Sequence, residues 1–182
     1  MKKIFSACAI IALFATFGTL TCNANEPQLL IQDASVGSKF IDFKAKKVDI
    51  KNPKNDGVET SLAEIVAQGK PVVVDFWASW CGPCRREIKE FLSVYGPEYA
   101  DKVNFVGVAV WEESVEDTKK AMQELPITWP VVIAGDRKDS PTKAYGINGI
   151  PHIMLIGKDG IVKARDLRGE AIKAAIEAEL HK

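Results

Sequence analysis

The sequence predicts an α/β fold in which a mixed central sheet is covered by helices on both faces. Strand-like and helix-like segments alternate up to about residue 146, and the pattern of a hairpin followed by a final helix comes after them. Residues 72–77 are almost entirely apolar, which is typical of a strand that is buried on both faces of a sheet. Together these observations favour one domain over residues 36–182, long enough to enclose a hydrophobic core.

The first part of this domain is predicted to contain short strands and a short helix. Alternating polar and apolar residues and a dense turn signal at residues 52–57 place the strands. The strands are expected at residues 36–43, 44–50 and 58–60. Ser61 and Glu64 have the spacing of a capping box, so a short helix should begin there and reach about Gln68.

A longer helix is predicted after the buried strand. It continues from Arg85 to Tyr95 with apolar residues on one face, and Gly96 and Pro97 should stop or kink it.

The second half of the domain is predicted from apolar runs and helix-capping residues. Strands are expected at residues 103–110, 129–134, 153–156 and 161–166, the second of them short or at a sheet edge. Helices are expected at residues 114–125 and 140–145 and after Gly169. Ser114 is a suitable N-cap, Pro141 occupies a first helical position, and residues 158–160 have the composition of a hairpin turn.

The N-terminal 24 residues are predicted to be a secretory signal peptide. Two lysines precede an apolar run at residues 4–20, and small residues surround a cut after about Ala24. Two alternatives stay open: a membrane anchor, for which the run is short, and acylation of Cys22 as the first residue of a lipoprotein. Residues 25–35 are then a leader. We expect the domain in the periplasm or cell envelope, with membrane contact only if Cys22 is lipidated.

Charge and ligand content argue against two classes of function. The chain has 24 basic and 24 acidic residues, whereas nucleic-acid-binding domains carry a clustered basic surface. A structural zinc site needs about four ligands. Outside the signal peptide the sequence offers only Cys81, Cys84, His152 and His181 as cysteine or histidine ligands. We therefore expect no nucleic-acid partner, no metal and no bound cofactor.

Cys81 and Cys84 are the two cysteines that remain once Cys8 and Cys22 leave with the signal peptide. A bridge across two intervening residues closes a very short loop and adds little stability, so its value should be chemical. The pattern predicts a strand that delivers the pair to the first turn of a helix. Unpaired N–H groups and the helix dipole favour a thiolate there, and the thiolate is the form that attacks disulfides.

The residues around this pair resemble a known family. The run from Val74 to Cys84, with the sequence VDFWASWCGPC, resembles the active-site run of thioredoxin-fold proteins, and residues 149–151 resemble their cis-proline segment. The chain is most similar to the exported TlpA/ResA-like branch of thiol–disulfide oxidoreductases. The resemblance implies a thioredoxin-like fold over residues 36–182, with an N-terminal β extension and a central βα insertion at residues 111–130. Lys89 stands where this branch commonly has proline, which we expect to alter the bend of the active-site helix.

The resemblance implies a role for each residue of the pair and its surroundings. Cys81 should be the exposed nucleophile that forms a mixed disulfide, and the more buried Cys84 should resolve it. Gly82 and Pro83 should set the turn between them. Asp75 should lie buried beneath the pair, where a raised pKa lets it accept the proton of Cys84.

Partner binding is expected beside the pair. Pro151, if it is cis, should face the cysteines and leave the backbone of Ile150 free to bind an extended substrate segment. Trp80 should lie in the partner-binding surface. His152 is either a spectator or a residue that tunes Cys81. Residues 111–113 either line the same rim or form a solvated loop.

The function that follows is reduction of protein disulfides in exported proteins. A narrower form is a dedicated reductant for cytochrome c maturation, as in some relatives. The alternatives are a peroxiredoxin-like peroxidase, whose proline and threonine pattern is missing before Cys81, and a non-catalytic binding module. A reductase in an oxidising compartment must be recharged, so we also expect a membrane thiol-electron donor as partner.

Overall fold

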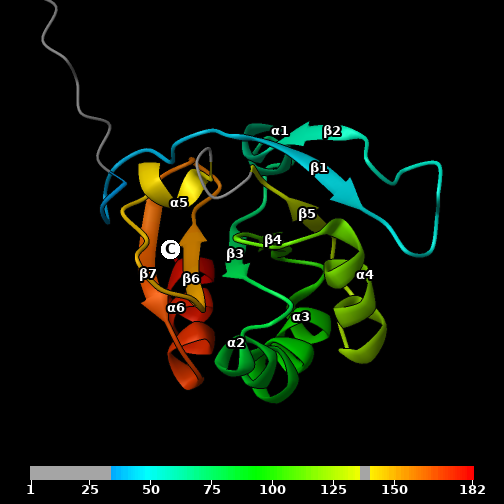
Figure 1. Cartoon of the computed structure of the whole chain (residues 1–182). Coiled ribbons are helices and arrows are strands. Elements are labelled where there is room, and N and C mark those ends of the chain that lie inside the picture. The colour runs from blue at the N-terminus through cyan, green and yellow to red at the C-terminus, as the bar shows by residue number, and fades with distance from the viewer. Residues whose placement is uncertain (1–33, 136–139) are drawn as a thin grey trace, which may run out of the picture. The chain divides into compact units, whose positions relative to one another are not determined.

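The computed structural model describes residues 34–135 and 140–182. These residues form a seven-stranded sheet in the order β2-β1-β5-β4-β3-β6-β7 (Figure 1). The strands are β1 (Lys44–Val48), β2 (Glu59–Ser61), β3 (Val72–Trp77), β4 (Asn104–Ala109), β5 (Val131–Ile133), β6 (His152–Ile156) and β7 (Val162–Leu167). β3 pairs parallel with β4 and antiparallel with β6, so the prediction of a mixed sheet is confirmed.

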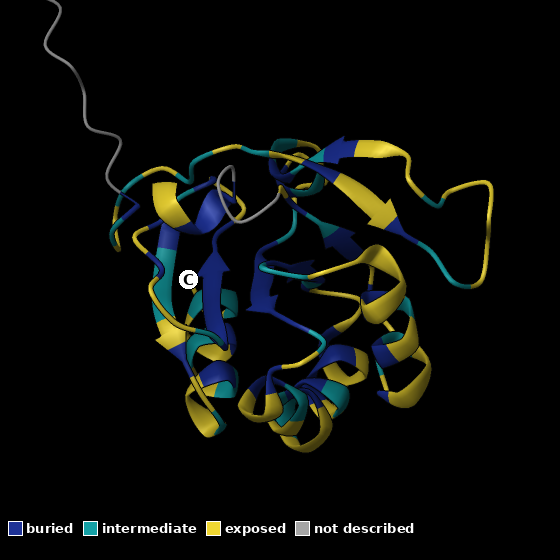
Figure 2. Ribbon diagram, viewed as in Figure 1, coloured by how far each residue is buried: buried dark blue, intermediate teal, exposed yellow. Residues whose placement is uncertain are grey.

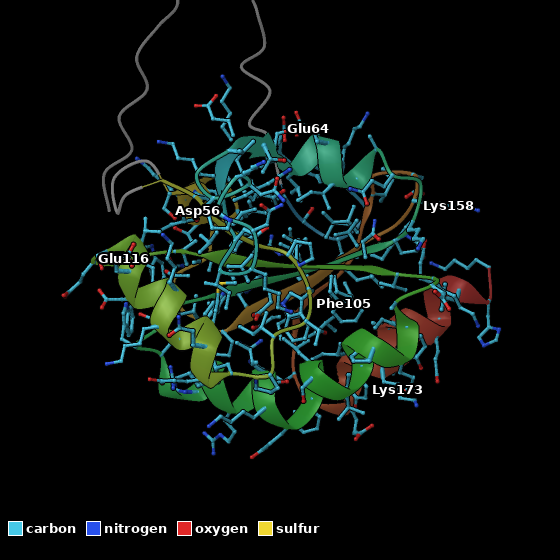
Figure 3. The ribbon with its side chains drawn as sticks, turned by 90° about the vertical axis from the view of Figure 1, so that its right-hand side faces the viewer. Asp56, Glu64, Phe105, Glu116, Lys158 and Lys173 are labelled. Atoms are coloured by element: carbon cyan, nitrogen blue, oxygen red, sulfur yellow. A yellow bond between two sulfur atoms is a disulfide. The ribbon has the colours of Figure 1, made fainter. Side chains whose placement is uncertain are left out.

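Helices cover both faces of this sheet, as the sequence predicts. They are α1 (Leu62–Val66), α2 (Gly82–Glu87), η1 (Ile88–Leu92), α3 (Ser93–Tyr99), α4 (Val115–Glu124), α5 (Pro141–Ala144) and α6 (Glu170–Leu180). In Figure 1, α1 and α5 lie on one side of the central strands, and α2, α3 and α6 lie on the other. α3 and α6 lie side by side and are tied by an ion pair of 2.9 Å between Glu98 and the labelled Lys173 (Figure 3).

Alternate residues of β3 point into two separate cores, and this explains the uninterrupted burial of that strand (Figure 2). Val73 and Trp77 pack with the apolar faces of α3, α4 and α6. Val72, Val74 and Phe76 pack with α1 and with Tyr145 and Ile147, which follow α5. Side chains on opposite faces of a strand alternate, so one apolar run supplies both layers. Burial on both faces holds β3 in the centre of the domain. The cysteine pair that follows β3 is therefore attached to a well-packed strand.

The capping predictions are confirmed at two helices. The Ser61 hydroxyl accepts a hydrogen bond of 3.2 Å from the Glu64 N–H at the start of α1. The Ser114 hydroxyl accepts one of 3.2 Å from the Asp117 N–H at the start of α4. Each hydroxyl provides an acceptor for an N–H group that has no partner within its helix.

The predicted helix after the cysteine pair is longer and less regular than expected. η1 is a π-helical turn that contains Lys89, and α3 continues through Gly96 and Pro97 to Tyr99, so the prediction of a stop there is wrong. Proline removes a single backbone donor, while burial of Tyr95 and Tyr99 against the sheet holds the last turn in place. A π turn shifts the register of one helix face, and such turns are a known cause of helix bends.

Two further predictions need correction, and a third is confirmed in one of its two forms. Residues 36–43 make no strand and contribute only the isolated bridge between Lys39 and Ile161, because Gly37 turns the chain with a φ of 93°. β5 is short but not an edge strand, since β1 pairs on its outer side. In the central insertion the helix α4 precedes the strand, and that strand, β5, begins after Pro130 rather than within residues 111–130.

The predicted signal peptide, residues 1–24, and most of the leader at 25–35 lie outside the described residues. Among the residues that are described, none of the helices has the length and apolar character that a membrane crossing requires.

Candidate active site

The cysteine pair lies at the start of α2, a few residues after the end of β3. Cys81 is the N-cap of α2, and it is joined to Cys84 by a disulfide with a Cα–Cα distance of 5.2 Å. The Cys84 N–H donates to the Cys81 sulfur over 3.2 Å. A sulfur at this position faces the first N–H groups of a helix, and these groups stabilise negative charge. When the disulfide is reduced, the same geometry favours the Cys81 thiolate.

Cys81 is more enclosed than the sequence suggests, whereas Cys84 is the more buried of the two, as expected. Cys84 is fully buried, and Cys81 is only 4% exposed, so the expectation of an exposed Cys81 is wrong for the disulfide form. Gly82 and Pro83, which separate the two cysteines, are exposed.

Asp75 lies in the middle of β3, where Gly107 of β4 and Ile153 of β6 flank it. It is 3% exposed, and its Oδ1 has no hydrogen-bond partner among the described residues. Burial and, to a smaller extent, the nearby Glu87 raise the pKa of Asp75 to about 8, while Arg168 acts in the opposite direction. A carboxyl group with this pKa exchanges a proton readily near neutral pH.

The peptide bond between Ile150 and Pro151 is cis. The Cys81 sulfur lies 3.7 Å from the Ile150 carbonyl oxygen, so this segment sits directly beside the disulfide. Within the described residues, the Ile150 N–H makes no hydrogen bond. A free N–H in an extended segment is what a substrate chain needs in order to add as a strand.

The loop before Cys81 is held by a residue that sequence analysis left undecided. Glu112 accepts two hydrogen bonds of 2.6 Å, from the Ser79 N–H and from the Ser79 hydroxyl. Trp80 is 54% exposed, and its indole N–H donates to the Trp111 carbonyl over 3.1 Å. Glu112 follows β4, whose carboxyl end meets that of the parallel β3 at one edge of the sheet. That rule was the available signal, and residues 111–112 are part of the rim rather than a solvated loop.

A second set of contacts comes from the connection between β7 and α6, which sequence analysis did not single out. The Arg168 guanidinium donates to the Pro151 carbonyl oxygen. The neighbouring Gly169 N–H donates to Glu87 Oε1 over 2.5 Å. Nothing in the local sequence marks these residues, because their partners lie 17 and 82 positions away.

His152 follows the cis peptide on β6 and is 9% exposed. Its Nδ1 lies 3.7 Å from an Asp166 oxygen, and its Nε2 has no partner among the described residues. Burial lowers the pKa of His152, Arg165 adds to this effect and Asp166 opposes it. A neutral imidazole is therefore favoured.

Among the described residues, no three His, Cys, Asp or Glu side chains gather in a way that could hold a metal ion.

Comparison with known proteins agrees with this geometry. The sequence pattern of the AhpC/TSA family matches residues 36–165. The thiol-disulfide oxidoreductase ResA of Bacillus thuringiensis subsp. konkukian is 30% identical over 145 residues, which cover 78% of this chain and 71% of that protein. The ResA of Geobacillus thermodenitrificans is 34% identical over 113 residues, 62% of this chain. The chain spans 63% of the length of that relative.

Solved structures give the same picture of the fold. The thioredoxin domain of a thiol-disulfide oxidoreductase from Bacteroides vulgatus superposes with a TM-score of 0.66 at 30% identity, covering 79% of this chain and 96% of that one. A putative thiol:disulfide interchange protein DsbE from Chlorobium tepidum gives a TM-score of 0.66 at 27% identity, over 80% of this chain and 98% of that one. The prediction of a thioredoxin-like fold is confirmed.

Proposed function

This chain belongs to the AhpC/TSA family, and on that basis we propose that it is a thiol–disulfide oxidoreductase of the ResA type that reduces disulfides in other proteins. The observation that supports this most strongly is the Cys81–Cys84 disulfide at the start of a helix, beside a cis Ile150–Pro151 peptide. The pair is the redox group, so the reaction needs no bound cofactor.

In the proposed cycle the reduced protein supplies two electrons and two protons. The Cys81 thiolate attacks one sulfur of the partner disulfide, the partner S–S bond breaks, and a mixed disulfide forms. Cys84 then loses its proton to Asp75 and attacks the Cys81 sulfur. The intramolecular disulfide forms, and the partner leaves with both of its cysteines reduced. Asp75 is suited to this step because a carboxyl with a pKa of about 8 is partly ionised at neutral pH.

Substrate binding is proposed to use both sides of the disulfide. An extended segment of the partner would pair with the free Ile150 N–H, next to Pro151, in the manner of an added strand. The exposed Trp80 would contact the same segment from the other side, and Gly82 and Pro83 would leave room for its approach. The partners would be exported proteins with disulfides, in the periplasm or cell envelope. A membrane thiol-electron donor would return the site to its dithiol form.

Insulin reduction tests this function. Reduced protein should cleave the insulin interchain disulfides, and Cys81→Ser should lower the rate at least about a thousandfold because the nucleophile is lost. Cys84→Ser should instead accumulate mixed disulfides that reducing agent releases. Turnover of insulin by Cys81→Ser, or no mixed disulfide with any exported protein in Cys84→Ser, would contradict the proposal. Hydrogen peroxide turnover by the same samples tests the alternative of a peroxidase.

A further inference from the structure

We propose that Arg168 is a positioning residue of this site: its guanidinium holds the cis Ile150–Pro151 segment against the disulfide and sets a positive charge opposite Glu87 beside the Asp75 carboxyl. This inference rests on the proposed function, since it assigns a role in the same site. It concerns a residue that touches neither sulfur and that lies outside every sequence motif described above.

The Arg168 guanidinium contacts two backbone carbonyls and one carboxylate. Its Nη2 donates to the Pro151 carbonyl and lies 3.1 Å from an Asp166 oxygen, and its Nη1 donates to the Leu167 carbonyl over 2.6 Å. Three acceptors fix the orientation of the planar group although the side chain is 41% exposed. The Pro151 carbonyl is thereby held by the connection between β7 and α6.

The backbone just before Arg168 is irregular, and this irregularity orients the side chain. The pairing of β6 with β7 changes register near Leu155, and Asp166 has a φ of 54°, a left-handed conformation that is uncommon for residues other than glycine. Irregularities of this kind redirect side chains and gather near functional sites. Here they turn Asp166 toward both His152 and Arg168, so that one carboxylate steadies the guanidinium.

Gly169, the residue that follows Arg168, contacts α2. Gly169 donates its N–H to Glu87 Oε1, and Glu87 lies three residues after Cys84 on α2. Two consecutive residues of one connection therefore hold the two sides of the site: Arg168 holds the Pro151 carbonyl, and Gly169 holds α2. A change in this connection would move both sides relative to the sulfurs.

Arg168 also acts on Asp75 through its positive charge. Glu87 from α2 and Arg168 from the β7–α6 connection are the charged groups that act on Asp75, and their effects on its pKa are opposite. On the neighbouring strand, His152 is faced by Asp166, Arg165 and Arg168. Removing the Arg168 charge leaves Glu87 unopposed, so the Asp75 carboxyl should hold its proton to higher pH.

The test uses the oxidised full domain and three variants: Arg168→Gln, Arg168→Lys and the control Arg86→Gln. Arg86 is an exposed arginine on α2, so its replacement removes the same charge near the site. Two NMR readouts need no substrate: the titration of the Asp75 carboxyl carbon and the resonance of the Pro151 carbonyl carbon. We expect Arg168→Gln to raise the Asp75 pKa by about 1 and to shift the Pro151 resonance.

Arg168→Lys separates charge from hydrogen bonding. It should leave the Asp75 titration near that of the wild type, because the charge is kept, yet still shift the Pro151 resonance, because an ammonium lacks the planar fork. A purely structural role would not produce this division. If Arg168→Gln leaves both resonances as they are in Arg86→Gln, the proposal is overturned. Since neither readout involves catalysis, a failure of insulin reduction in the wild type would contradict the proposed function and leave this inference standing.

Discussion

The two sides of the disulfide are fastened by opposite chemistry. On the helix side, which comprises residues 79–85, a carboxylate accepts from the backbone: Glu112 binds the Ser79 N–H. On the proline side, which comprises residues 150–152, a guanidinium donates to the backbone, from Arg168 to the Pro151 carbonyl. Each side uses the group that its exposed backbone requires.

The difference has a consequence for how each side responds to change. Ser79, two residues before Cys81, presents an N–H group and a hydroxyl, and the Glu112 carboxylate accepts from both. On the proline side, the positive charge of the Arg168 guanidinium lowers the pKa of the buried Asp75. Substitutions on the two sides should therefore have separable effects.

The largest expected effect is at Asp75, which lies between the two sides. Its pKa is raised from 3.8 to about 8, so the folded state holds a proton that the unfolded chain has released between these pH values. The contribution of Asp75 to stability should therefore be greatest near pH 4 and fall by about 5 kcal/mol as pH rises to 8. Asp75→Asn should remove most of this slope, as measured by urea unfolding of the oxidised protein across this range.

The same variant should slow the reaction. Without a proton acceptor for Cys84, insulin reduction at neutral pH should fall about a hundredfold. If Asp75→Asn retains the pH slope of the wild type, the carboxyl is not the group that burial perturbs.

On the helix side, Glu112→Ala should cost about 2 kcal/mol of unfolding free energy, because two charge-assisted hydrogen bonds to Ser79 are lost. Glu112→Gln keeps an acceptor for the Ser79 N–H and should cost less than half as much. Glu113→Ala, a change at the exposed neighbour, is the matched control and should fall within about 0.5 kcal/mol of the wild type. Equal losses for Glu112→Ala and Glu113→Ala would show that the Ser79 loop is held by other contacts.

On the proline side, His152 should give a smaller effect of the opposite sign to that of Asp75. Its pKa lies below the ordinary 6.5, because burial disfavours the charged imidazole. The unfolded chain takes up the proton first, so stability should be lost as pH falls below 6.5. His152→Gln should reduce this acid-side slope in urea unfolding, whereas His181→Gln, at an exposed position near the C-terminus, should not. A slope unchanged in His152→Gln would rule out a buried neutral imidazole.

Much of the fold could be predicted because its signals are local. The apolar run of β3 and the hydroxyl caps of Ser61 and Ser114 act within a few residues, and each formed as expected. The strand predicted at residues 36–43 did not form. Alternation of polar and apolar residues does not by itself supply a partner strand, and Gly37 interrupts the extended backbone. The π turn at Ile88–Leu92 has no comparable local signal, since tertiary packing decides it.

The site divides in the same way. A contiguous motif marked Cys81, Cys84 and Asp75, and a short motif marked Pro151, but their roles remain predictions. Arg168 and Glu87 meet the site through contacts between distant segments, and a single sequence gives no indication of which distant segments will meet. The depth of burial of Cys81 also depends on the whole surface around it, which is why its exposure was overestimated.

The ionisation of the Cys81 thiol can be measured directly. In the reduced Cys84→Ser variant, the rate of Cys81 alkylation by iodoacetamide should reach half its maximum well below the pH of about 8.5 expected for a free cysteine, because the first N–H groups of α2 stabilise the thiolate. A midpoint at or above about 8.5, that of a free cysteine, would contradict the central claim that the helix start makes Cys81 a nucleophile.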